Sequence, residues 1–140
     1  MWFEDVRTRE DIEEYLKQHT ERVNDKRRLE DLWAAIYSPN SASIVQAFGE
    51  SSPGDPTATK ALKALDIRQD HEALTVETDR VYQALYALDV EEENVVWWRC
   101  ISRERYSMDQ IALKLSTSRR TVYRRWDSAL NKIAVKWGIA

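Results

Sequence analysis

The chain has 140 residues, which makes one domain the default and two small ones the limit, with room for a modest core. Hydrophobic residues make up 43% and charged residues 32%, with only three Gly and three Pro, which excludes collagen-like or low-complexity character and argues against disorder. The formal net charge of −3 by itself suggests no affinity for polyanions.

The first predicted element is a long helix from Arg9 to Tyr37. The segment lacks Gly and Pro, and its apolar residues recur near helical spacing. Its middle, residues 17–31, is rich in Glu, Arg and Lys and poor in apolar residues. Such a stretch is equally consistent with a solvated helix and with a helix that pairs with a second chain in a dimer.

Residues 38–55 are predicted to form a linker or long loop. Together with Pro56 they hold all three Pro, two of the three Gly and several Ser. The segment is not wholly hydrophilic, and four of its apolar residues could fold back over the helices: Ile44, Val45, Ala47 and Phe48.

A second long helix is predicted to begin at Pro56 and to continue to about Asp89. Asp55 is a suitable N-cap and Pro is favoured at the first helical position. A third helix follows, with Glu91–Glu93 as its polar first turn and an apolar face of Val95, Val96, Trp98 and Ile101. Cys100 is expected to be a buried small side chain in this helix.

Two further helices are predicted near the C-terminus, separated by a short polar turn. Ser107 and Gln110 have the spacing of a capping box before a helix from Met108 to Leu115. Ser118 is a second N-cap candidate, and the helix after it, Arg119 to Trp137, carries an apolar stripe at steps of three and four: Val122, Trp126, Ala129, Ile133 and Trp137. Two helices in this arrangement have the layout of a helix-turn-helix.

The charge is distributed unevenly between the two parts of the chain. Residues 101–140 carry nine Lys or Arg against three Asp or Glu, a local net charge of +6. The first hundred residues carry 12 against 21, a net charge of −9. This asymmetry is typical of a nucleic-acid-binding module joined to a non-binding one, so we predict a scaffold or oligomerisation region over residues 1–89 and a DNA-binding domain over residues 90–140.

The predicted DNA-contacting residues follow from the geometry of the last helix at about 100° per residue. With the apolar stripe turned inward, Arg120 and Arg124 lie nearly opposite it and are the candidates for reading guanine in the major groove. Thr121 and Tyr123 flank the stripe, and Tyr123 could contact either base or phosphate. The residues suited to phosphate contact are Lys114, Ser116, Thr117, Ser118, Arg119, Arg125 and also Lys132.

The segment Tyr106 to Ile133, YSMDQIALKLSTSRRTVYRRWDSALNKI, resembles the promoter-reading C-terminal helix-turn-helix of bacterial sigma factors. With the IYSP and GDPTATKA segments and the ALYALD end of the second long helix, the whole chain is similar to phage and prophage late-gene regulators of the ArpU and RinA kind. The resemblance implies an activator of packaging and lysis genes in the bacterial host cytoplasm, at the nucleoid. One departure is Ser116, which stands where many such turns carry Gly.

Other functions stay open. The chain could be the small DNA-recognition subunit of a phage packaging terminase, or a helical interaction module whose basic tail binds RNA polymerase. A homodimer is possible. An enzyme, a cofactor, a metal site and a membrane span are not expected, because the chain lacks a Gly-rich phosphate loop, a cluster of metal ligands around Cys100, His19 and His71, a signal peptide and a long apolar run.

Overall fold

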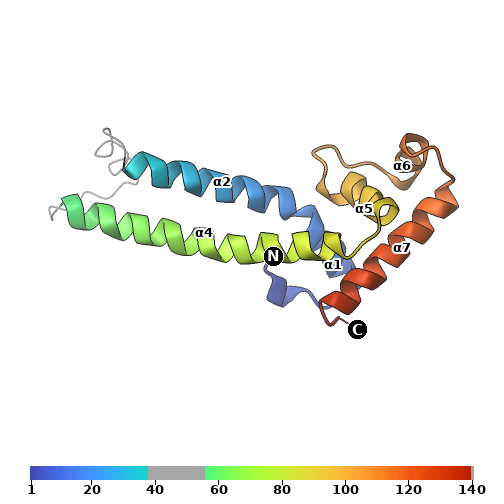
Figure 1. The fold of residues 1–140 in the computed structure, drawn as a ribbon, viewed down its shortest axis with the longest axis horizontal. Coiled ribbons are helices and arrows are strands. Elements are labelled where there is room, and N and C mark those ends of the chain that lie inside the picture. Colours follow the sequence, from blue (N-terminus) through green and yellow to red (C-terminus); the bar gives the residue numbers. More distant parts are fainter. Residues whose placement is uncertain (38–55, 140) are drawn as a thin grey trace. The chain divides into compact units, whose positions relative to one another are not determined.

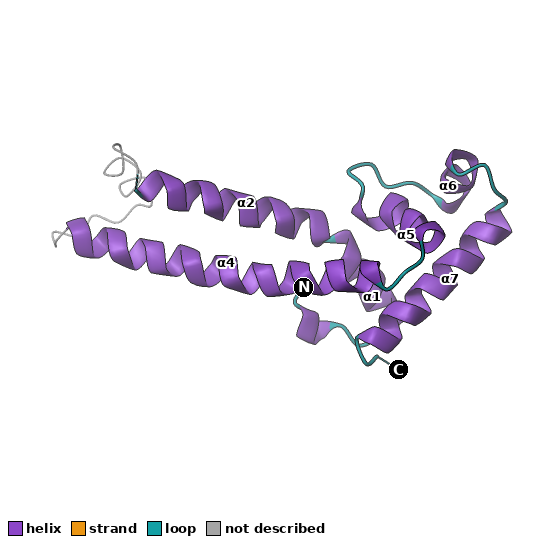
Figure 2. Cartoon of the chain, viewed as in Figure 1, coloured by secondary structure: helices purple, strands orange, loops and turns teal. Residues whose placement is uncertain are grey.

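The computed structural model describes residues 1–37 and 56–139, and these residues form helices and connecting turns without any β-strand (Figures 1 and 2). The predicted all-α fold is therefore confirmed. The elements in chain order are η1 (Phe3–Asp5), α1 (Arg9–Lys17), α2 (His19–Ile36), α4 (Pro56–Tyr86), α5 (Val90–Val96), η2 (Trp97–Ile101), α6 (Met108–Lys114) and α7 (Arg119–Lys136).

The chain forms two compact units, and both ends of the chain belong to the first. Unit 1 comprises Met1–Arg22 and Glu77–Ala140, and unit 2 comprises Val23–Val76. This division differs from the predicted segments 1–89 and 90–140. The reason is burial: Ile12 of α1 and Val81 of α4 are fully buried in the same core as the C-terminal helices, so they belong with α7 rather than with a separate N-terminal scaffold.

The predicted single helix from Arg9 to Tyr37 is wrong at Gln18, where α1 ends and α2 begins. Helix α1 buries three residues in the core of unit 1, among them Tyr15. Two carbonyl groups at its C-terminal end accept from arginines: Arg22 Nη1 donates to Tyr15 O at 2.8 Å, which Gln18 N also reaches at 3.3 Å, and Arg105 Nη2 donates to Lys17 O at 2.6 Å. The break therefore costs few unsatisfied backbone groups.

Helix α4 begins at Pro56, as predicted, and ends at Tyr86. The predicted linker over residues 38–55, its apolar residues 44–48 and the expected cap at Asp55 lie outside the described residues. In unit 2, residues 56–76 of α4 lie beside residues 23–36 of α2 (Figure 1). The prediction of two long helices is confirmed for α2 and α4, with α1 as a separate short helix before them.

Asp89 ends the connection after α4 and caps α5, where its carboxylate accepts from Glu92 N at 2.8 Å. The third predicted helix is therefore present, and its last turn, η2, is widened into a π-helix that closes with Ser102 N donating to Trp97 O at 2.8 Å. Cys100 is buried there, and burial raises the pKa of its thiol to about 12, as expected for a core side chain.

The core of unit 1 is built around α7. Val122, Ala129 and Ile133 of the predicted stripe are fully buried and Trp126 is nearly so. The stripe ends in an aromatic cluster, in which Trp137 meets Phe3 and Tyr15 edge to face, with ring centroids 5.3 and 5.5 Å apart. Helices α5 and α6 both pack against α7 (Figure 1). This packing decides which side of α7 remains exposed.

Candidate nucleic-acid interface

Helix α6 begins at the predicted capping box. Ser107 N donates to Gln110 Oε1 at 2.9 Å, and Gln110 N donates to Ser107 Oγ at 3.2 Å. The helix buries Met108, Ile111 and Ala112. Its end is close to the prediction, since Leu115 is the C-cap rather than the last helical residue.

The turn between α6 and α7 is a Schellman motif with Ser116 in the left-handed conformation. Its φ is +53°, and the two closing hydrogen bonds run from Thr117 N to Ala112 O at 3.0 Å and from Ser116 N to Leu113 O at 3.3 Å. The end of α7 is closed in the same way, but there the left-handed residue is Gly138, with φ +69°. The chain therefore forms a Gly-type turn with a serine at the position where the resemblance would place Gly.

Ser118 is the N-cap of α7, as predicted. Its Oγ accepts from Thr121 N at 3.2 Å and lies 2.9 Å from Thr121 Oγ1. Both hydroxyl groups are thus engaged locally. Thr117 and Thr121 are half-buried and Ser116 is exposed, so Ser116 presents the freest hydroxyl of the turn.

Arg120 and Arg124 lie on the exposed side of α7, opposite the buried stripe. Within residues 1–37 and 56–139, neither side chain forms an ion pair or hydrogen bond with another side chain. Tyr123 borders this pair and is 40% exposed. The structure therefore brings the predicted base-reading arginines together on one open face, which we call the free arginine face: Arg120 and Arg124.

Three other cations of α7, Arg119, Arg125 and Lys132, are paired with acidic side chains of its neighbours. Arg119 Nε lies 3.2 Å from Asp109 Oδ1 of α6, and Arg119 Nη2 donates to Tyr123 Oη at 3.4 Å. The hydrogen bond to Tyr123 and the nearby Asp109 carboxylate raise the pKa of Arg119. Arg125 Nη2 lies 3.4 Å from Glu91 Oε2 of α5.

Lys132 belongs to a third acidic contact, centred on the buried Glu92. This carboxylate is 3% exposed and accepts hydrogen bonds from both Lys132 Nζ and Ser128 Oγ. Burial raises the pKa of Glu92, but the hydrogen bonds from Lys132, Ser128 and Asp89 outweigh it and lower the pKa to about 2. Lys132 is therefore a structural partner of α5, which the sequence-based prediction of a phosphate contact did not foresee.

Lys114, another predicted phosphate contact, lies over the aromatic rings of Trp98 at 4.3 Å and Tyr106 at 5.1 Å. Its side chain remains exposed. The acidic partners Asp109, Glu91 and Glu92 were not recognised in the sequence as part of this site. The run of acids at residues 91–93 indicated only a helix start, because nothing in its spacing shows which helix will lie beside it.

The electrostatics of α7 differ from those of the other capped helices of unit 1. Helices α1, α5 and α6 each carry acidic residues in the first turn, where the helix dipole favours negative charge. Helix α7 has none there and instead begins with Arg119 and Arg120. Positive side chains at the positive end of a helix dipole are unfavourable, and an anion bound nearby would relieve this repulsion.

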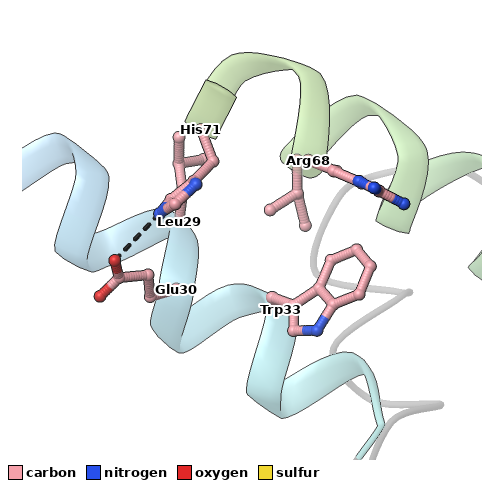
Figure 3. A pocket seen from close by; sticks show the side chains of 6 residues that line it. Leu29, Glu30, Trp33, Arg68 and His71 are labelled. Atoms are coloured by element: carbon pink, nitrogen blue, oxygen red, sulfur yellow. Dashed lines mark hydrogen bonds and ion pairs between the residues drawn. The ribbon is translucent and has the colours of Figure 1, made fainter. Parts of the chain in front are cut away.

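Unit 2 contains a cavity of about 290 Å³ between α2 and α4 (Figure 3). His71 Nε2 and Glu30 Oε1 lie 2.9 Å apart at its edge, and the His71 hydrogen bond lowers the pKa of Glu30. Trp33 of α2 and Arg68 of α4 also line it (Figure 3). No acidic, histidine or cysteine side chains gather into a metal-binding group within the described ranges, and no helix there is long and apolar enough to cross a membrane.

The comparisons with known proteins add no assignment to this site. Neither a protein-family model, nor a curated protein, nor a solved structure matches the chain.

Proposed function

We propose that the protein is a sequence-specific double-stranded DNA-binding transcriptional regulator that places the N-terminal half of α7 in the major groove. The observation that carries this proposal is the free arginine face. Arg120 and Arg124 are exposed and unpaired in the described chain, whereas the cations on either side of them have acidic partners.

The spacing of the two arginines supports contact with a polyanion. Residues four apart lie one turn apart on the same face of a helix, and like charges at that spacing destabilise an isolated helix by roughly 0.2–0.5 kcal/mol. A duplex supplies the missing counter-charge. An arginine in the major groove can also donate two hydrogen bonds to guanine O6 and N7, which discriminates against other bases by about 1–3 kcal/mol.

Phosphate contacts would surround the arginine pair. Ser116 is exposed in the turn before α7, and Lys114 is exposed at the end of α6. Arg119 is exposed despite its contact with Asp109 and can turn toward a phosphate. Tyr123 accepts a hydrogen bond from Arg119, so its own hydroxyl proton is available to a base or phosphate acceptor.

The direction of regulation rests on the resemblance to late-gene regulators of the ArpU and RinA kind. By this analogy the protein activates packaging and lysis genes in the bacterial cytoplasm, bound at the nucleoid. Direct contact with RNA polymerase belongs to the same proposal.

The first prediction concerns the free arginine face. Replacing either arginine, Arg120→Ala or Arg124→Ala, should weaken binding to a duplex selected from a random pool by about 5- to 150-fold, the range of one lost bidentate base contact. Arg27→Ala, an exposed arginine of α2 in unit 2, is the matched control and should leave affinity unchanged. Fluorescence anisotropy with labelled duplex measures both.

Salt dependence provides an independent check. The wild-type affinity should fall as salt rises, because phosphate neutralisation releases counterions. Affinity that is independent of salt, or arginine variants that bind as the wild type does, would contradict DNA binding and favour the alternative of a helical module that binds a protein such as RNA polymerase.

An assembly role is favoured by one observation on unit 2. Helix α4 exposes three large apolar side chains on one side, at Leu62, Leu65 and Val76. This agrees with the predicted oligomerisation function of the long helices. Native mass measurement separates the alternatives: a monomer or homodimer fits the regulator, whereas a ring of many subunits fits a terminase small subunit.

A further inference from the structure

On the side of α7 that faces α5, Arg125 forms an ion pair and so does not belong to the free arginine face. The side chain of Arg125 is 22% exposed, and its Nη2 atom lies 3.4 Å from the Glu91 carboxylate. Glu91 itself is 68% exposed. The pair therefore lies at the border of the proposed DNA contact, with its acidic member open to solvent.

The position of Glu91 is set by its buried neighbour. Glu92 accepts hydrogen bonds from Lys132 and Ser128 of α7, and it also receives Asp89 N at 3.1 Å in the capping box of α5. The first turn of α5 is thereby held against the middle of α7. The backbone of Glu91 is consequently held where its side chain can reach Arg125.

Arg125 follows Arg124 directly, so its side chain leaves the helix about 100° from that of Arg124 and about 140° from that of Arg120. A carboxylate and a phosphate offer a guanidinium group the same kind of acceptor oxygen, and one guanidinium edge cannot serve both at once. We infer that Glu91 acts as an internal counter-ion that competes with DNA phosphate for Arg125 and so lowers the affinity of the protein for DNA of every sequence. The inference rests on the proposed function.

The competition has a defined electrostatic consequence. While Arg125 is paired with Glu91, it neutralises no phosphate and releases no counterion from the duplex. When it is freed, one further phosphate contact becomes possible, and the slope of log affinity against log salt should steepen by about 0.9. Because phosphates carry no sequence information, the gain should be equal for a specific site and for random DNA.

The test compares Glu91→Gln with Glu93→Gln in the whole 140-residue chain, using a labelled duplex of random sequence. Both variants remove one exposed negative charge from the first turn of α5, but Glu93 forms no ion pair with α7 among the described residues. Glu91→Gln should bind about tenfold more tightly than the wild type at about 50 mM salt, with the steeper slope. Glu93→Gln should show only the small general effect of losing one acid.

A double variant identifies the arginine responsible. In an Arg125→Ala background, Glu91→Gln should gain no more affinity than Glu93→Gln does. Equal affinities for the two Gln variants, or a Glu91→Gln gain that persists without Arg125, would overturn the inference. If the wild type itself shows no salt-dependent binding to DNA, the proposed function fails first, so the two failures are distinguishable.

Discussion

At the residue scale, Ser116 shows how the turn before α7 is formed at some cost in stability. A left-handed residue closes a Schellman motif most easily when it is Gly, because a Cβ atom crowds the following carbonyl oxygen. The chain uses Gly138 at the end of α7 but Ser116 at the end of α6. The departure noted in the sequence therefore does not prevent the turn, which forms with serine in the less favourable conformation.

The prediction at this position is a gain in stability. Ser116→Gly should raise the free energy of unfolding by up to about 1 kcal/mol, because relief of the left-handed strain outweighs the greater entropy of Gly in the unfolded chain. Ser116→Ala is the control and should give no gain, since it keeps the Cβ atom. Urea denaturation measures both, and a Gly variant less stable than the Ala variant would count against strain at this turn.

At the element scale, the acidic first turn of α5 has two functions. It complements the dipole of its own helix, and it joins that helix to α7 through Glu92. The capping box at Asp89 was within reach of sequence analysis, since Asp and Glu three residues apart before an apolar run are typical of a helix start. The contact between Glu92 and Lys132 could not be predicted from the sequence, because residues 40 positions apart meet only after the helices have packed.

Glu92→Gln should lower the free energy of unfolding at pH 7 by about 1–3 kcal/mol, because Lys132 loses its buried partner. The Glu92 pKa falls from an ordinary 4.5 to about 2 on folding. The Glu92 carboxylate therefore binds a proton more readily in the unfolded chain than in the folded one. The stabilisation is therefore complete above about pH 5 and is lost as the pH falls toward 2. Denaturation of the two proteins at pH 7 and pH 2.5 checks this, and the difference between them should shrink in acid.

Glu93→Gln is the matched control for that experiment, since Glu93 is exposed in the same turn. Its unfolding free energy at pH 7 should fall by no more than the roughly 0.3–1 kcal/mol that one exposed acid contributes through the helix dipole. A Glu92→Gln difference of the same size in acid and at neutral pH would mean that lost packing, rather than the charged contact, accounts for the change.

At the scale of the whole molecule, unit 1 is assembled from two segments that are distant in sequence. Tyr15 joins them, because its hydroxyl donates to the Glu77 carboxylate while the Arg22 guanidinium lies 3.8 Å from its ring centroid. Arg22 and Glu77 are the last residue of the first segment and the first residue of the second. Both contact the same tyrosine, so the two ends that lead into unit 2 are close together.

Unit 1 should therefore fold without unit 2. The variant replaces residues 23–76 with about six Gly and Ser residues, which span roughly 13 Å on average. It should keep a cooperative thermal transition and the near-ultraviolet circular dichroism spectrum of the aromatic cluster. DNA affinity should stay within about twofold if one copy of α7 suffices for binding. A folded protein that binds much more weakly and forms a smaller oligomer than the wild type would instead show that unit 2 supplies an assembly contact.

The sequence by itself determined the local features of this protein. Helix starts at Pro56, Ser107 and Ser118 and the buried stripe of α7 follow from capping chemistry and helical period, which act over a few residues. Tertiary structure decided the break at Gln18, the inclusion of α1 in the core of the C-terminal helices, and which basic residues of α7 have an acidic partner and which, like Arg120 and Arg124, do not. These depend on which helices lie side by side, and a helical period shows only that a face is buried, not what buries it.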